Sequence, residues 1–291
     1  MVNSARGGND ILNGGTGDDR LYGDASDMHD TTSGGNDTLI GSVGGFWGDA
    51  LAMWDSSRGG NDTISTTDSS SGLSFMVGDA DQMHDNARGG NDTLTSTHFG
   101  PNLVSSLMGD AYQMYDNTRG GNDTLTVSGS GYGYGSSFLH GDAVEMHSHA
   151  RGGDDALTGG DGNDLLYGDA FTMFDDAQGG RDNLYGGAGD DVLCGDARNY
   201  TNFSGTGGKD VLNGGSGNDH LFGGLNDDQF VFNVGSGNDV IWDFDKGNLV
   251  STSTAATPEH DIVKPLQPEA IGAVMEVTKW LKPSISVSQD W

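Results

Sequence analysis

Large apolar residues recur at fixed positions of nonapeptide units through most of the chain, and glycine and aspartate fill many of the positions between them. The nonapeptides ARGGNDILN (5–13) and GGTGDDRLY (14–22) show the pattern, with Gly at position four, Asp at position six and an apolar residue at position eight. Glycine permits tight turns and close backbone approach. The pattern therefore predicts a turn of six residues followed by a strand of three residues with one buried side chain.

Three kinds of nonapeptide alternate along the chain. The first reads GDAxxM and then an aromatic residue or His (109–117), the second reads xRGGNDTLx (118–126), and the third reads GGxGxDxUx, where U is large and apolar (159–167). One set of three spans 27 residues and stays in register from 141 to 194. Two arrangements fit this period. Two nonapeptides per coil would stack unlike units, whereas three per coil would stack like on like in a three-sided helix. Both are all-β parallel solenoids.

The third nonapeptide is also where the length varies. It has 7 residues at 41–47, 12 at 66–77, 13 at 96–108 and 14 at 127–140. Each version keeps a large apolar residue two places before the next Gly-Asp-Ala. We therefore expect the strand to be retained and the additional residues to loop out.

The position-six aspartates form the candidate metal site. Stacked turns would bring their carboxylates about 4.8 Å apart, the spacing of neighbouring strands. Such a row repels itself unless a hard divalent cation with six to eight oxygen ligands lies between the turns, and Gly and Asp with almost no Cys favour Ca²⁺ over zinc or copper. On the order of ten ions are expected. The predicted ligands are Asp10, Asp19, Asp37, Asp62, Asp92, Asp123, Asp155, Asp164, Asp182, Asp191, Asp210, Asp219, Asp228 and Asp239.

These GGxGxDxUx units resemble the RTX (hemolysin-type calcium-binding) nonapeptide repeat over residues 5–242. The resemblance implies a parallel β-roll that folds on Ca²⁺, and it favours two nonapeptides per coil. It also implies a secreted, extracellular bacterial protein, exported by type I secretion machinery that reads an uncleaved C-terminal signal. The GDAxxM unit departs from the repeat because it lacks Gly at position four and Asp at position six, so we expect no standard Ca²⁺ turn there.

The GDAxxM unit offers the candidate catalytic residues. Its Met at position six is expected to fill the core, and positions seven and eight would align as an exposed row of rings and carboxylates. This row could be a solvated edge, a carbohydrate-stacking strip or a source of acid–base chemistry. The catalytic candidates are His29, Asp30, His84, Asp85 and His147.

The composition excludes several classes of binding partner. The 291 residues carry a formal charge of −30, which opposes binding to nucleic acid or to an anionic membrane. No apolar run is long enough to span a bilayer, and the single Cys194 excludes an intrachain disulfide framework.

Glycine nearly disappears after residue 247 and proline becomes frequent. We therefore divide the chain into a calcium-binding roll (1–247) and a C-terminal cap or secretion-signal tail (248–291) with a short helix at 269–282.

Three functions remain open. The first is a secreted calcium-binding repeat protein whose folding is driven by Ca²⁺. The second is an enzyme acting on a carbohydrate or small molecule through the GDAxxM face and the inserts, although the sequence contains no recognised catalytic motif. The third is an adhesive or ice-binding surface, which could involve a polysaccharide or cell surface as partner. For that function, Thr38, Thr63, Thr93 and Thr124 recur after the position-six Asp and could order water.

Overall fold

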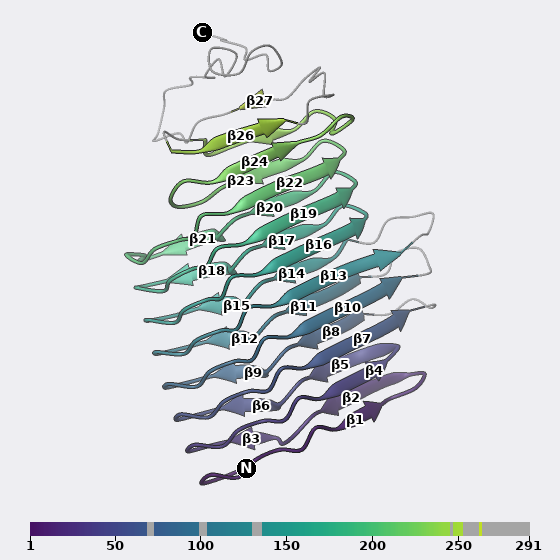
Figure 1. Ribbon diagram of the computed structural model, residues 1–291, viewed down its shortest axis with the longest axis vertical. Coiled ribbons are helices and arrows are strands. Elements are labelled where there is room, and N and C mark those ends of the chain that lie inside the picture. The colour runs from purple at the N-terminus through teal and green to yellow at the C-terminus, as the bar shows by residue number, and fades with distance from the viewer. Residues whose placement is uncertain (69–72, 99–103, 130–135, 245–246, 253–261, 264–291) are drawn as a thin grey trace.

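Parallel β-strands stacked coil upon coil make up the described chain (Figure 1). The structure is a computed structural model that describes residues 1–68, 73–98, 104–129, 136–244, 247–252 and 262–263. No helix occurs in these residues. The all-β parallel solenoid is therefore confirmed, with strands that form three sheets.

The three kinds of nonapeptide supply one sheet each. The first sheet, formed by the RGGNDTL units and their C-terminal equivalents, contains β1 (Ile11–Asn13), β4 (Thr38–Gly41), β7 (Thr63–Asp68), β10 (Thr93–His98), β13 (Thr124–Gly129), β16 (Ala156–Asp161), β19 (Asn183–Ala188), β22 (Val211–Ser216), β24 (Gln229–Phe232) and β26 (Leu249–Thr252). The second sheet contains β2 (Asp18–Tyr22), β5 (Val43–Trp47), β8 (Leu73–Val77), β11 (Val104–Met108), β14 (Phe138–His140), β17 (Leu165–Tyr167), β20 (Val192–Cys194), β23 (His220–Phe222), β25 (Val240–Ile241) and β27 (Ile262–Val263). The third sheet, formed by the GDAxxM units, contains β3 (Asp27–Met28), β6 (Ala50–Met53), β9 (Ala80–Met83), β12 (Ala111–Met114), β15 (Ala143–Met146), β18 (Ala170–Phe174) and β21 (Ala197–Thr201).

The strand register shows that three nonapeptides make one coil. Leu157 pairs with Leu184 in the first sheet, Leu166 with Leu193 in the second and Ala143 with Ala170 in the third. Like units therefore stack on like units through β21. The arrangement with two nonapeptides per coil, which the family resemblance favoured, is wrong for this part of the chain. The physical reason is that the GDAxxM unit forms a strand with its own buried residues and needs a third sheet to pack them.

After β21 each coil of the described chain is shorter and contains strands of the first and second sheets only. Leu212 of β22 pairs with Phe230 of β24, only 18 residues later, and Leu221 of β23 pairs with Ile241 of β25. No described strand of the third sheet accompanies these coils. The narrowing begins where Gly223-Gly224 takes the place of a Gly-Asp-Ala tripeptide. Strands β26 and β27 then extend the first two sheets beyond residue 247. The predicted helix at 269–282 lies outside the described residues.

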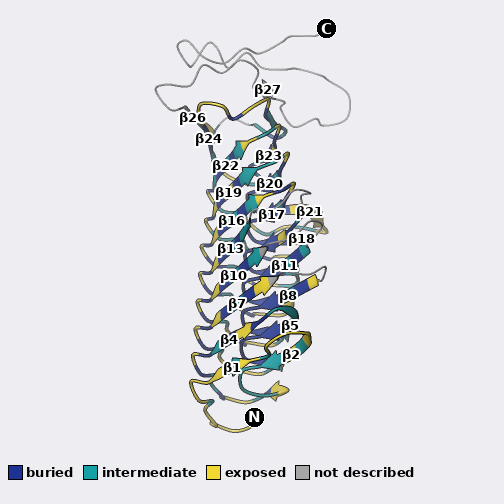
Figure 2. Ribbon diagram, turned by 90° about the vertical axis from the view of Figure 1, so that its right-hand side faces the viewer, coloured by how far each residue is buried: buried dark blue, intermediate teal, exposed yellow. Residues whose placement is uncertain are grey.

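Two long apolar cores and a small third cluster of Trp47, Val77 and Met108 occur in the described roll, and Figure 2 shows that many strand residues are buried. The core between the first and second sheets is built mainly from position-eight leucines such as Leu94 and Leu125. The other core lies under the third sheet and contains alanines and methionines. The methionines predicted to fill the core are all fully buried, namely Met28, Met53, Met83, Met114, Met146 and Met173.

The inserts leave the strands intact, as predicted. Phe46, Met76, Leu107 and Leu139, which precede the Gly-Asp-Ala tripeptides, are fully buried in the second sheet. The first and second sheets keep their register on both sides of each insert. Residues 69–72, 99–103 and 130–135 of these inserts lie outside the described part of the chain.

Candidate metal sites

Three rows of aspartate run along the roll, each formed by one sequence position. The GGND row follows the second nonapeptide into the last coils and comprises Asp10, Asp37, Asp62, Asp92, Asp123, Asp155, Asp182, Asp210 and Asp228. The turn row, between the first and second sheets, comprises Asp19, Asp164, Asp191, Asp219 and Asp239. The GDA row, between the second and third sheets, comprises Asp24, Asp49, Asp79, Asp110, Asp142, Asp169 and Asp196.

The GGND row is held in place by its own backbone. The amide of Asp92 donates a hydrogen bond of 2.7 Å to Oδ1 of Asp123 in the next coil, and the contact repeats along the row at 2.6–3.1 Å. Each carboxylate thus bridges two coils through one oxygen. From Asp37 onward the residues are at most 2 % exposed, whereas Asp10, in the first coil, is exposed.

The second carboxylate oxygen of this row points into the protein without a hydrogen-bond partner. This is true of Oδ2 of Asp37, Asp62, Asp92, Asp123, Asp155, Asp182 and Asp210. Burial raises the pKa of Asp62 to about 8 and that of Asp37 to about 6. In the described part, no Lys, Arg or His forms an ion pair with these seven aspartates. Because burying an uncompensated charge is costly, the row requires either protons or cations.

The turn row has the same geometry but is interrupted. The amide of Asp164 donates to Oδ1 of Asp191 (2.8 Å) and the amide of Asp191 to Oδ1 of Asp219 (2.9 Å). Gly162 and Gly189 in these turns have φ of 137° and 133°, which a residue with a side chain rarely adopts. Between Asp19 and Asp164, the aligned positions hold Gly44, Ser74, Ser105 and Ser137. The predicted ligand Asp19 thus has no neighbouring carboxylate in its row.

Hydroxyl groups replace the turn row in the coils with inserts. The buried Ser96 lies 2.7 Å from Ser105, oxygen to oxygen, and accepts a hydrogen bond of 3.1 Å from Thr66. These neutral side chains satisfy one another, so this corner needs no cation.

The GDA row is the part of the site that the sequence analysis missed. Six of its seven members, all except Asp24, lie in the interior, and Asp49 and Asp142 are 0 % exposed. The carboxylate of Asp142 accepts a hydrogen bond of 2.7 Å from the amide of Gly153, on the other side of the same coil. The unbroken recurrence of this Asp in seven Gly-Asp-Ala tripeptides was the available signal, but it falls outside the position-six frame.

The residues fit a hard cation held partly by the backbone. No cluster of three His, Cys, Asp or Glu side chains with metal-binding geometry occurs among the described residues. An ion in these rows would therefore be held by one or two carboxylates and completed by carbonyl oxygens, a donor set that suits Ca²⁺. The unpartnered oxygens supply the carboxylate part of that set.

Comparison with known families decides the identity of the repeat. The sequence model of the RTX calcium-binding nonapeptide repeat matches four stretches of the chain, at residues 4–27, 149–171, 176–199 and 204–241. The chain carries RTX calcium-binding repeats. The matched RTX stretches contain all five aspartates of the turn row, whereas the inserts lie between the first and second stretches. A search of curated proteins found no match.

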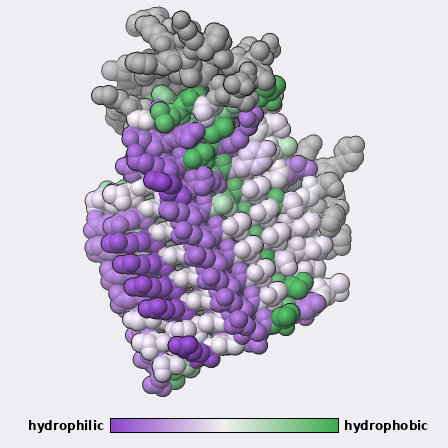
Figure 3. All heavy atoms as spheres, in the orientation of Figure 1, coloured by the Kyte–Doolittle hydropathy of each residue, from purple (hydrophilic) through white to green (hydrophobic). Residues whose placement is uncertain are grey.

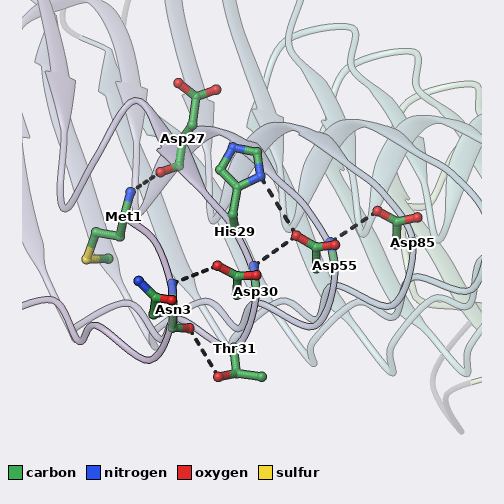
Figure 4. Close-up of polar contacts among 8 residues, drawn as sticks. All are labelled: Met1, Asn3, Asp27, His29, Asp30, Thr31, Asp55 and Asp85. Carbon is green, nitrogen blue, oxygen red and sulfur yellow. Dashed lines mark hydrogen bonds and ion pairs between the residues drawn. The ribbon is translucent and has the colours of Figure 1, made fainter.

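The catalytic candidates follow the strands of the third sheet, and Figure 4 shows three of them, His29, Asp30 and Asp85. There Asp30 and Asp85 have positive φ, and their carboxylates accept backbone amides: Asp30 from Asn3 (2.7 Å) and Asp85 from Asp55 (3.1 Å). Nδ1 of His29 lies 3.8 Å from Oδ2 of Asp55. The carboxylates thus act as turn caps between successive coils. Whether any of these residues is catalytic stays a prediction.

The rings beside these caps form a continuous stack. Trp54 lies on His84 with ring centroids 3.9 Å apart and planes 6° apart, and His84 lies on Tyr115 at 4.8 Å. His147 stacks on both Tyr115 and Phe174, and its Nε2 lies 3.2 Å from Oε2 of Glu145. Because the ring faces cover one another, they present edges to solvent, which does not favour the stacking of a sugar ring.

The described residues contain no helix that is long and apolar enough to cross a membrane.

Proposed function

We propose that this calcium-binding repeat protein uses Ca²⁺ to fold, with ions held by the GGND row and the turn row. The unpartnered, buried carboxylate oxygens of these rows carry the proposal. Without a cation they repel one another inside the protein, and with Ca²⁺ the same oxygens become ligands that join neighbouring coils. Ion binding would then contribute directly to the free energy of folding.

We further propose that the protein is secreted by bacteria and folds outside the cell, where Ca²⁺ is abundant. RTX repeats, which are typically extracellular, support this proposal. Extracellular calcium modules bind with Kd values of about 10⁻⁴ to 10⁻³ M. Sites of that affinity would leave the chain unfolded before export and fold it afterwards.

A calcium titration followed by far-UV circular dichroism tests the folding proposal. The wild-type chain is expected to change from coil to β-sheet with Ca²⁺ and not with Mg²⁺, which needs a stricter octahedral site. The rate of alkylation of Cys194, which is buried in β20, should fall over the same range of Ca²⁺ concentration. A calcium-free chain that is already fully β-structured at neutral pH would overturn the proposal.

A matched pair of variants in one region makes the titration specific. Asp191→Asn removes one charge from the turn row and should raise the Ca²⁺ midpoint by roughly tenfold, which corresponds to about 1.4 kcal/mol. Asp161→Asn removes the same charge from an exposed position at the end of β16 and should leave the midpoint within about twofold. Equal shifts in the two variants would mean that net charge, not ligation, controls folding.

A second candidate function rests on the outer face of the first sheet. Thr63, Thr93 and Thr124 align in register with Thr38, as the ice-binding alternative requires, and all but Thr38 are exposed. Two further columns lie beside them on the same face: Ser65, Thr95 and Thr126, and Thr67, Thr97 and Ser128. Figure 3 shows the side of the roll that carries these strands as a pale area of intermediate hydropathy. A regular array of hydroxyl and methyl groups on a flat sheet could order water into an ice-like layer.

Replacing Thr95 at the centre of this array tests the ice-binding candidate. Thr95→Tyr should abolish inhibition of ice recrystallisation because a large side chain disrupts the flat face, while the Ca²⁺ midpoint stays within about twofold. Tyr185→Thr, on the same column but outside the array, is the control and should not lower the activity. Absence of ice activity in the calcium-loaded wild type would rule out this candidate.

A further inference from the structure

From Asp49 onward, the interior of each coil with three nonapeptides contains two facing carboxylates. Asp110 of the GDA row and Asp123 of the GGND row belong to one coil, and both are at most 2 % exposed. Asp110 is the largest source of charge repulsion on Asp123. In the next coil, Asp155 of the GGND row is the largest source of charge repulsion on Asp142 of the GDA row. The two rows thus face each other along the inside of the roll, between the leucine core and the methionine core.

Both rows contain buried oxygens without a hydrogen-bond partner, and these oxygens lie close to glycines on the opposite side of the coil. In the GDA row these are Oδ1 of Asp49 and Oδ2 of Asp110, Asp142 and Asp169, and in the GGND row Oδ2 of Asp62, Asp123, Asp155 and Asp182. The other oxygen of each GDA carboxylate is occupied; Asp110 Oδ1, for example, accepts the amide of Gly121 at 2.7 Å. The free oxygens are therefore not a result of poor orientation, since each carboxylate is fixed by a hydrogen bond through its other oxygen.

Backbone oxygens converge on the same space. A Cβ added to Gly109 would lie 2.1 Å from Asp123 Oδ2 and 1.8 Å from the carbonyl oxygen of Gly141 in the next coil. A Cβ added to Gly120 would lie 2.1 Å from Asp110 Oδ2 and 2.4 Å from Asp142 Oδ1. Only glycine allows these oxygens to gather at such points. The glycines on both sides of the coil thus form a cradle lined with oxygen.

We propose that the space between the GDA row and the GGND row holds a file of Ca²⁺ ions, each shared by the two facing aspartates of one coil and completed by backbone carbonyl oxygens. This rests on the proposed calcium-dependent function and adds the GDA aspartate as a ligand that the nonapeptide motif does not contain. The file joins the third sheet to the other two, because its two carboxylates come from opposite sides of the coil. The narrow coils after β21 lack the GDA residue and hence this kind of site.

A double-mutant cycle on one coil tests the shared ion. Asp110→Asn, Asp123→Asn and the double variant are compared with wild type by native mass spectrometry at saturating Ca²⁺, which counts the bound ions. If one ion bridges the two residues, each single variant loses one ion and the double variant also loses one. Asp116→Asn, an exposed position in the same coil, should keep the full number.

The other possible results of this comparison either contradict the proposal or support it. Single variants that keep every ion, or a double variant that loses two, would overturn it, since the carboxylates would then act apart. If both single variants fail to fold at high Ca²⁺ and the double variant folds, the shared ion is supported, because removing both charges removes the need for it. Failure of all three to fold would count against it. A wild type that binds no Ca²⁺ would instead refute the proposed function itself.

Discussion

Calcium-free protein is expected to gain β structure when the pH is lowered from about 9 to about 5, because the buried carboxylates can be neutralised by protons instead of Ca²⁺. Burial raises the pKa of Asp164 to about 7 and the pKa values of Asp62 and Asp191 to about 8 in the folded chain. A carboxyl with a raised folded-state pKa stabilises the fold fully below its unfolded pKa, near 4, and loses that contribution as the pH rises through the folded value. The calcium-free roll should therefore be lost mainly between about pH 6 and 8.

The measurement is far-UV circular dichroism of protein passed over a chelating resin, recorded as a function of pH. The same titration in excess Ca²⁺ is the control and should show β structure at high pH, since the deprotonated carboxylates are then ligands. A calcium-free signal that stays constant from pH 9 to 5 would show that desolvation of these aspartates is not what holds the chain unfolded.

Gly90→Ala is expected to destabilise the calcium-loaded roll by at least about 3 kcal/mol. An added Cβ at Gly90 would lie 1.3 Å from the carbonyl oxygen of Gly60 and 2.4 Å from its carbonyl carbon, both in the preceding coil. Backbone atoms cannot move aside without separating the coils, and the amide of Gly90 is also fixed by Asp79. Moving the backbones of Gly60 and Gly90 apart would disturb both the first sheet and the GDA row.

Gly8→Ala provides a matched control in the same motif. Gly8 lies in the first coil, and the nearest atom to its added Cβ is Asp10 Oδ2, at an ordinary 3.4 Å. Its effect should be within about 0.5 kcal/mol, because the alanine meets no backbone and also reduces the freedom of the unfolded chain. Thermal unfolding of both variants in excess Ca²⁺ measures the difference. Similar melting temperatures for Gly90→Ala and Gly8→Ala would show that coil contact at this position is not tight.

The period and the residue types were enough to predict the solenoid, the GGND and turn rows and the buried methionines. Each of these depends on a single repeating position, such as Leu94 or Met83, whose burial follows from local geometry. The number of units per coil could not be predicted in this way, because a period of 27 is compatible with stacking like or unlike units. Pairing across the roll decided it, and that pairing is a property of the whole coil.

The GDA row shows a different limit of sequence reasoning. Asp142 looked unlike a ligand because it occupies position two of its nonapeptide rather than position six. Its burial and its approach to Asp155 depend on the bend between the second and third sheets, which places residues 13 positions apart on opposite sides of one coil. A sequence motif does not show that Asp142 and Asp155 approach each other across the coil.

At the corner between the first and second sheets, some coils carry a carboxylate and others a hydroxyl group. The length of the third nonapeptide differs between these two kinds of corner. Where Asp191 and Asp219 occupy the corner, the third nonapeptide keeps nine residues. Where Ser74 and Ser105 replace them, its length changes from coil to coil with no loss of register. Since the entropy cost of a longer loop grows slowly, these corners are natural positions for grafting foreign peptides, and neighbouring grafts would be displayed one strand spacing apart.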